Sequence, residues 1–260
     1  VHNTDRTQLF WAPVMGWNNY NKFMLGAALY NNLLIERKLE WALMPMYGFG
    51  NKDLAGGASI HYNIHPNKIF QTVRLGVNAE RYCYGTNLLP NTNFNKITQE
   101  IYMEMKNKHL NSPMKTSVNV QLIDVAKEVA VGDYGFAPPV YQYDTANTEI
   151  LDMTATVNNS RKINPYSFVY NVQGAQEFEK VSATFNYKVT FKKKGKALDI
   201  RLFAGTFIVN KTLTDGNYFF NASGSTGIHD YMYDNVFLGR SEYSGFLSHQ
   251  FAEMEGNMKV

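Results

Sequence analysis

Six charged side chains are the candidates for chemistry in this sequence. Each lies in a segment where polar and apolar residues alternate. They are Arg74, Glu80, Glu100, Glu104, Asp199 and Arg201. Successive side chains of a β-strand point to opposite faces, so all six are expected on polar strand faces. Opposite charges paired inside a narrow lumen would rigidify a barrel and block a pore. The same side chains could instead line a selective channel. We favour the structural interpretation of this lumen-facing charge network.

Two histidines share one predicted strand face. His61 and His65 are four residues apart, which is about 13 Å along a strand at roughly 3.3 Å per residue. That distance is too great for one metal ion to bridge. We therefore expect solvated histidines inside a lumen, although His61 could still meet a carboxylate on a neighbouring strand.

Catalytic and cofactor-binding motifs are missing from the chain. HExxH, GxSxG, the phosphate-binding loop and the dinucleotide fingerprint do not occur. A barrel phospholipase would need a serine and histidine pair, but no spacing singles one out. The only cysteine, Cys83, excludes an internal disulfide and is expected to be an inert small hydrophobe. The sequence therefore predicts no catalytic residue, no metal site and no cofactor in this chain.

The elements that position these residues are strands. From Val181 to Phe191 the apolar residues fall on odd positions and the polar residues on even positions. A lysine and glycine turn at residues 192–196 follows, and Leu198, Ile200 and Leu202 resume the alternation. One side of this hairpin is therefore apolar and the other is polar or charged.

The same period of two recurs along the chain, and no helical period competes with it. Further alternating segments lie at residues 23–30, 41–47, 58–64, 72–80, 97–106 and 117–122, with less regular ones at 150–157 and 166–174. We expect about ten strands in an antiparallel, up-and-down β-barrel, with a longer loop at Ala130 to Ala146. Asn210 to Ser244 is expected to be irregular, and Phe246 to Val260 to begin a last strand.

The loop from His229 to Phe251 is acidic and aromatic and contains an arginine. It could close over the barrel mouth or bind a partner. A packed surface loop is the simpler interpretation.

Alternation alone also fits a soluble sandwich or a lipocalin-like barrel whose apolar face points inward. Three features favour an apolar face that meets lipid. The polar faces are charged over their full length, the segments approach the ~9–11 residues of a membrane strand, and aromatic residues gather near strand ends. The aromatic content of 14% agrees with interfacial girdles.

Composition narrows the remaining classes. In 260 residues, 45% are hydrophobic and 18% are charged, which suits one β domain and argues against disorder. A net charge of +3 is too small to indicate nucleic acid as a partner. No run of about 18 apolar residues predicts a transmembrane helix. No signal peptide opens the chain, so we expect either a mature chain or a segment of a longer polypeptide.

Several segments together resemble a known family. NYNKFMLGAALYNN (Asn19 to Asn32) and LMPMYGFGNKDLAGGASIHY (Leu43 to Tyr62) resemble the start of a barrel domain of Gram-negative outer membranes. That domain is fused C-terminally to gluzincin-type zinc aminopeptidases in some bacteria. IRLFAGTF (Ile200 to Phe207), YDNVFLGR (Tyr233 to Arg240) and HQFAEMEGNMKV (His249 to Val260) resemble its later blocks.

The departures from this family limit what the resemblance implies. The peptidase's HExxH and its downstream glutamate are missing, so no catalytic residue can be carried over. The last block resembles the start of a further strand, which would leave the barrel open here. An open membrane edge is costly, so we expect a segment of a larger protein. Closure by a partner protein is the alternative.

The resemblance implies an outer-membrane β-barrel domain, noncatalytic by itself, that anchors or partners a zinc metallopeptidase domain at the bacterial cell envelope. Its partners would be the lipid bilayer, a fused peptidase or other envelope proteins. A stand-alone porin-like or binding barrel within an outer-membrane complex is the alternative. A soluble, lipocalin-like binding protein fits the charged faces less well.

Overall fold

The computed structural model describes residues 8–32, 36–85, 91–109, 111–133, 140–193, 195–211, 218–220, 227–235, 237–241 and 245–249. Eleven strands form one antiparallel sheet in which each strand pairs with its neighbours in sequence. They are β1 (Phe10–Asn18), β2 (Lys22–Tyr30), β3 (Leu39–Gly48), β4 (Asp53–Ile64), β5 (Phe70–Cys83), β6 (Asn93–Met105), β7 (Met114–Asp133), β8 (Val140–Asn159), β9 (Tyr166–Ala175), β10 (Phe178–Thr190) and β11 (Ala197–Asn210). Two short 3₁₀ helices, Gly227–His229 and Gly245–Ser248, follow the sheet. The predicted all-β, up-and-down fold is confirmed.

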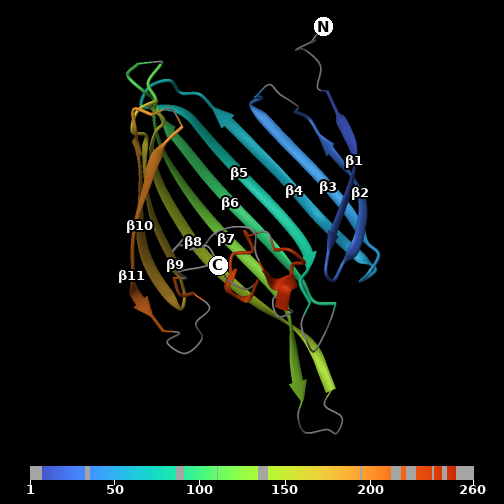
Figure 1. Ribbon diagram of the computed structural model, residues 1–260. Helices are drawn as coiled ribbons and strands as arrows, with labels where there is room; N and C mark the ends of the chain where they lie inside the picture. Colours follow the sequence, from blue (N-terminus) through green and yellow to red (C-terminus); the bar gives the residue numbers. More distant parts are fainter. Residues whose placement is uncertain are drawn as a thin grey trace.

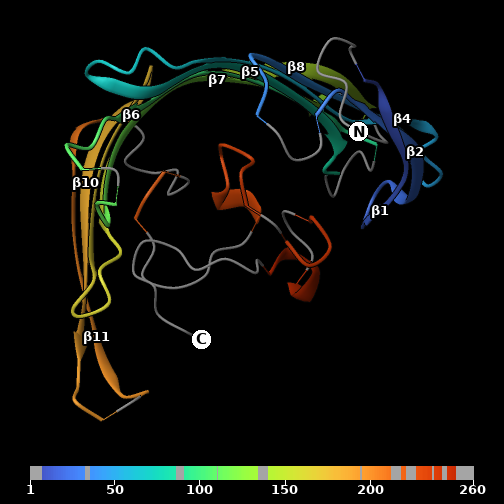
Figure 2. The same ribbon diagram turned by 90° about the horizontal axis from the view of Figure 1, so that it is seen from above.

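The sheet curves into an open arc (Figures 1 and 2). Among the described residues, β1 pairs only with β2 and β11 only with β10, so the sheet does not close on itself. The described residues that follow β11 lie inside the arc, on the concave side of the sheet (Figure 2). No helix among the described residues is long and apolar enough to cross a membrane.

The convex face carries the apolar residues of the alternating pattern. The strand register places Leu75 opposite Tyr62 on one side and Ile101 on the other, and Ile101 opposite Val120. These side chains are not covered: Leu75 is 43% exposed and Ile101 is 44% exposed. Because the register pairs these positions one to one from β4 to β7, the apolar side chains join into one continuous band.

The concave face carries the polar positions and the buried contacts. Four polar side chains on this face are buried: Lys96, Thr98, Gln173 and Lys180. A core of Tyr84, Phe94, Ile123, Val125, Ile150 and Tyr233 joins the wall of the sheet to the chain inside the arc. A second, smaller cluster of Met24, Met46 and Ala55 covers the concave side of β2–β4. The interior of this protein is therefore the concave side of the sheet.

Two neighbouring strands approach unusually closely at Gly26. A Cβ atom there would lie 2.0 Å from the carbonyl oxygen of Pro45, on β3. Only a residue without a side chain allows this approach. By contrast, a Cβ atom at Gly174, on β9, would meet nothing within 4 Å.

Two sequence predictions about the strands are corrected here. The expected ten strands are eleven, because Phe10–Asn18 forms β1, which was not predicted. The loop expected from Ala130 to Ala146 is wrong over most of its length, because β7 continues to Asp133 and β8 begins at Val140. Backbone pairing continues there (Asp133 opposite Val140) although no apolar alternation accompanies it. Hairpin hydrogen bonds do not depend on side-chain pattern, so hydrophobic periodicity misses this extension.

The end of the chain differs as well. Asn210 to Ser244 is irregular in its described residues beyond β11, as predicted. The strand expected from Phe246 is contradicted at its start, where Gly245–Ser248 is a 3₁₀ helix. The rest of that expected strand, residues 250–260, lies outside the described residues.

Candidate functional site

Residues 218–220, 227–235, 237–241 and 245–249, here called the inner segment, contact the concave wall through polar bonds. Lys96 of β6 forms an ion pair with Asp234. The Tyr231 hydroxyl donates a hydrogen bond of 2.6 Å to Oε1 of Gln173 on β9. Near the β1–β2 turn, the backbone N–H of Asn19 donates to the carbonyl of Gly239 at 2.6 Å. The inner segment is thus attached to strands at both ends of the sheet.

A buried ion pair holds the inner segment in shape. Nη1 of Arg240 donates to Oδ2 of Asp230 at 2.7 Å, and the two side chains are 14% and 2% exposed. The backbone N–H groups of Asp234 and Asn235 also donate to the Asp230 carboxylate, at 3.1 and 3.2 Å. A buried carboxylate needs this many donors to offset its lost hydration. Asp230 therefore organises the turn that presents Tyr231 and Tyr233 to the wall.

Aromatic rings and cations join the same surfaces. The rings of Phe94 (β6) and Tyr233 lie 4.1 Å apart between centroids. The Arg240 guanidinium lies 4.4 Å from the Tyr233 centroid and 5.6 Å from that of Phe94. On the wall, Lys127 lies 5.4 Å from the Tyr233 centroid. These are cation–π distances, and such contacts strengthen where water is excluded.

A second group of rings surrounds Lys180 of β10. Its ammonium donates to the carbonyl of Tyr218 at 3.2 Å. It also lies 5.0 Å from the centroids of Phe220 and Tyr231 and 5.7 Å from that of Phe178. Lys180 is only 4% exposed, so these rings lie against a buried ammonium group.

Two cavities remain between the wall and the inner segment. The first, the polar cavity, has a volume of about 420 Å³ and lies against β8–β11. Its wall side includes Asn171, Ser182, Thr184 and Arg201. The second, the methionine cavity, has a volume of about 520 Å³ and lies against β1–β3, β5 and β6. Met24, Met44, Met46, Glu80, Tyr82 and Arg240 are among the residues that line it.

The structure places the six residues of the predicted charge network on β5, β6 and β11, where Arg74 and Glu104 share contacts with Tyr102. Nε of Arg74 donates to Oδ1 of Asn63 at 3.0 Å. Glu104 accepts a hydrogen bond of 3.3 Å from the Tyr102 hydroxyl. Each of these two charges is thus satisfied by a neutral neighbour.

The other four charged residues also lie in separate surroundings. Glu100 accepts from Nε2 of Gln121 at 3.1 Å, and Asp199 pairs with Lys188 at 3.3 Å. Arg201 lies over the ring of Phe203 beside the polar cavity, and Glu80 lines the methionine cavity. No ion pair between described residues joins two of the six.

An ion cluster that the sequence did not predict lies where β4, β5, β6 and β7 meet. Nη2 of Arg81 lies 2.9 Å from Oδ2 of Asp53 and 3.9 Å from Oε1 of Glu128, while its Nη1 donates to Asn95 at 2.9 Å. Asn93 donates from its backbone to Glu128 at 2.7 Å. Of these contacts, only the one between Arg81 and Asn95 joins residues that are opposite each other in a hairpin, so only this contact could have been inferred from predicted strands.

The histidines and the cysteine behave as structural residues. Nε2 of His65 lies 3.6 Å from Oε1 of Glu36, and both side chains are close to half exposed. Cys83 is fully buried, as expected for a small hydrophobe. Within the described ranges, no three histidine, cysteine, aspartate or glutamate side chains are grouped so that they could hold a metal ion.

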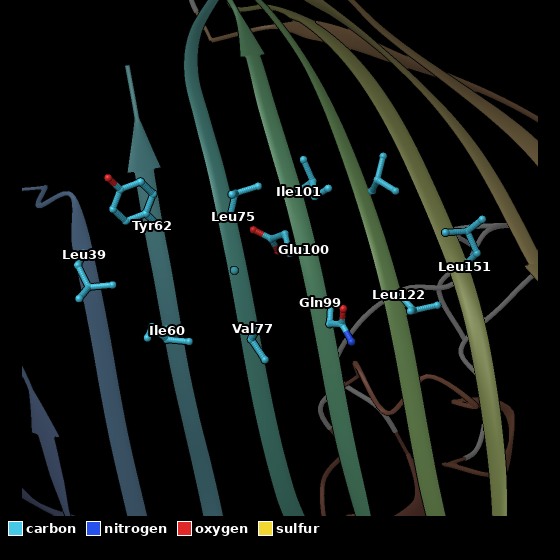
Figure 3. A pocket seen from close by; sticks show the side chains of 12 residues that line it. Leu39, Ile60, Tyr62, Leu75, Val77, Gln99, Glu100, Ile101, Leu122 and Leu151 are labelled. Carbon is cyan, nitrogen blue, oxygen red and sulfur yellow. The ribbon is translucent and has the colours of Figure 1, made fainter. Parts of the chain in front are cut away.

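The convex face has a shallow apolar groove of about 390 Å³ (Figure 3). Ile60, Leu75, Val77, Ile101 and Leu122 line it from strands β4 to β7. Gln99 also lines the groove and is exposed there. The groove belongs to the apolar band, and Gln99 and Glu100 are the polar residues of its lining, so the chemically richer surfaces are those on the concave side.

No protein-family model, curated protein or solved structure matches this chain.

Proposed function

We propose that this chain is part of the wall of an outer-membrane β-barrel, noncatalytic by itself, which anchors or partners a zinc metallopeptidase domain at the cell envelope. The apolar convex band carries the membrane part of this proposal. Large apolar side chains remain exposed on every strand from β1 to β8. Contact of such a continuous apolar surface with water is unfavourable, whereas contact with lipid is favourable. The polar side chains face the concave side.

Aromatic clusters at strand ends support a membrane boundary. At the β1–β2 and β3–β4 turns, the rings of Phe23 and Phe49 stack with centroids 6.0 Å apart. Tyr47 meets Phe49 edge to face at 5.4 Å, and Trp17, opposite Phe23, is 54% exposed. Tyrosine and tryptophan side chains favour the interface between lipid and water.

On the two longest strands, β7 and β8, the apolar band of the convex face stops at acidic residues. Asp124 and Glu149 are directly opposite each other on β7 and β8, both exposed, and on the face that carries Leu122 and Leu151. From Met114 to Leu122, the convex-facing part of β7 has the length of a membrane strand, about 9–11 residues. Beyond Asp124 the hairpin extends past the rest of the sheet (Figure 1). We infer that this extension lies in water.

In lipid, the free edges of β1 and β11 must be paired, because hydrocarbon offers no hydrogen bonds to backbone groups. The proposal therefore includes further strands between β1 and β11, from a longer chain or from a partner. The second candidate, a binding barrel in an envelope complex, is favoured by the two cavities beside the inner segment. An open pore fits less well, because that segment occupies the concave side.

The membrane part can be tested with the three natural tryptophans. Trp11, Trp17 and Trp41 all lie on the convex face, opposite Leu29, Phe23 and Ile60. In vesicles of brominated phosphatidylcholine we expect strong quenching of their fluorescence, and weak quenching by aqueous acrylamide. The control replaces all three by phenylalanine and carries Tyr231→Trp, a concave reporter that brominated lipid should not quench. Quenching of the natural tryptophans by acrylamide alone would overturn the membrane assignment.

The peptidase part has a separate test. Protein extracted from its native membrane in detergent is expected to be far heavier than 29.7 kDa, to yield an HExxH peptide, and to carry aminopeptidase activity that chelators remove. A species near 29.7 kDa without such activity would refute the peptidase role and leave the membrane assignment standing.

A further inference from the structure

The methionine cavity has walls of two kinds. Thioethers from β2 and β3 form one side, where Met24 and Met46 are 3% and 5% exposed. Aromatic rings form the other, from Tyr82 and Phe94 on the wall and Tyr233 on the inner segment. Thioethers and aromatic rings are soft, adaptable surfaces that suit an apolar or aromatic ligand body. A volume of about 520 Å³ is within the usual range of small-molecule sites.

The charges around this cavity do not balance. Arg240 lines this cavity and pairs with Asp230. Asp234 also lines it and pairs with Lys96, which is not itself a lining residue. Glu80 also lines the cavity, but no cation among the described residues is within ion-pair distance of it. The Glu80 carboxylate, which is exposed, therefore has no counter-ion among the described residues.

The register explains why Glu80 has no ion-pair partner among the described residues. Lys96 is directly opposite Glu80 on the adjacent strand, and both side chains lie on the concave face. Neighbouring opposite charges on a sheet normally pair. Here the lysine instead contacts Asp234, which the inner segment brings to it. Docking of the inner segment thus removes the natural counter-ion of Glu80.

We propose that the methionine cavity binds a small organic cation with one positive charge and an apolar or aromatic body. The ligand's ammonium or guanidinium group replaces Lys96 at the Glu80 carboxylate. Its body lies against Met24, Met46 and Tyr82, where the ring face of Tyr82 also attracts a cation. This site is additional to the proposed function and does not depend on what the convex face contacts.

Other ligand classes fit less well. An anion would be repelled by the Glu80 and Asp234 carboxylates, which both line the cavity, although Nη2 of Arg240 has no hydrogen-bond partner among the described residues. A calcium or magnesium ion needs six or more oxygen ligands, whereas thioethers and rings form most of this wall.

The test uses the protein in detergent, labelled with ¹³C at its methionine methyl groups, and the probe phenethylammonium. We expect saturable shifts of the Met24, Met44 and Met46 signals, and no saturable shift with neutral 2-phenylethanol. Glu80→Gln should weaken binding about fivefold, the upper end of the range for an exposed ion pair. The matched control is Glu104→Gln, a concave carboxylate outside this cavity, which should leave the affinity unchanged. Shifts of equal size with 2-phenylethanol, or equal affinity in Glu80→Gln, would overturn the proposal.

A second variant tests the counter-ion exchange. Asp234→Asn removes the partner that holds Lys96, so Lys96 should turn to Glu80 and weaken the binding of phenethylammonium. In the Glu80→Gln background, Asp234→Asn should then have no further effect. Additive losses in the double variant would contradict the exchange, because they would mean that Asp234 and Glu80 act independently.

Discussion

Leu75→Arg is expected to destabilise the folded protein in lipid by about 2–4 kcal/mol, the cost of a cation at the middle of a membrane barrel's outer face. Leu75 lies on β5 between Tyr62 and Ile101 and is 43% exposed on the convex side. An arginine there could reach water only by extending along the sheet past other apolar side chains. Denaturant unfolding of the protein in phosphatidylcholine vesicles measures the difference.

The same strand offers the control. Asn78 lies on the concave face of β5, opposite Ser59 and Thr98, where its neighbours are polar. Asn78→Arg should therefore change the free energy of unfolding by much less than Leu75→Arg. Equal losses at the two positions would mean that the convex face does not contact lipid.

Arg240→Met is expected to loosen the inner segment by about 3–5 kcal/mol, because it leaves the Asp230 carboxylate buried without a counter-ion. Asp230 is 2% exposed and would keep only its bonds to neighbouring amide groups. The methionine retains the length of the arginine stem but loses both the charge and the cation–π contacts to Phe94 and Tyr233. We expect the inner segment to detach while the sheet stays folded.

Hydrogen exchange of the amide groups in residues 227–241 measures this effect. A loss of about 3 kcal/mol corresponds to exchange more than a hundredfold faster. Arg201→Met is the control, because Arg201 lines the polar cavity without a carboxylate partner among the described residues. Unchanged protection of the inner segment in Arg240→Met would show that the buried ion pair does not hold it in place.

The strands and their two faces were predictable from sequence, because both follow from local alternation. The ladders around Leu75, Ile101 and Leu202 lie on the strands where they were expected, with their apolar residues on one face. Strand limits were less predictable where pairing does not depend on pattern. β1 contains Pro13 and the extended ends of β7 and β8 carry no apolar alternation, so neither has the signal on which the prediction relied.

The candidate sites were less predictable than the fold. All six charged residues named from the sequence lie on β5, β6 or β11, yet none forms an ion pair with another of the six. Glu80 shows why: its expected partner, Lys96, is the nearest cation by register, but Asp234 takes that role. A rule that pairs opposite charges on adjacent strands cannot account for Asp234, which binds Lys96 from 138 residues further along the chain.

By itself the sequence determined an antiparallel β-sheet with one apolar and one polar face, because a period of two is a property of neighbouring residues. Only the tertiary structure decided the curvature of the sheet and which face became convex. It also decided the position of the inner segment against the concave face. These features depend on contacts such as Asp230 with Arg240, Phe94 with Tyr233 and Lys96 with Asp234. Such contacts form between irregular segments and distant strands, and no local periodicity encodes which residues will meet.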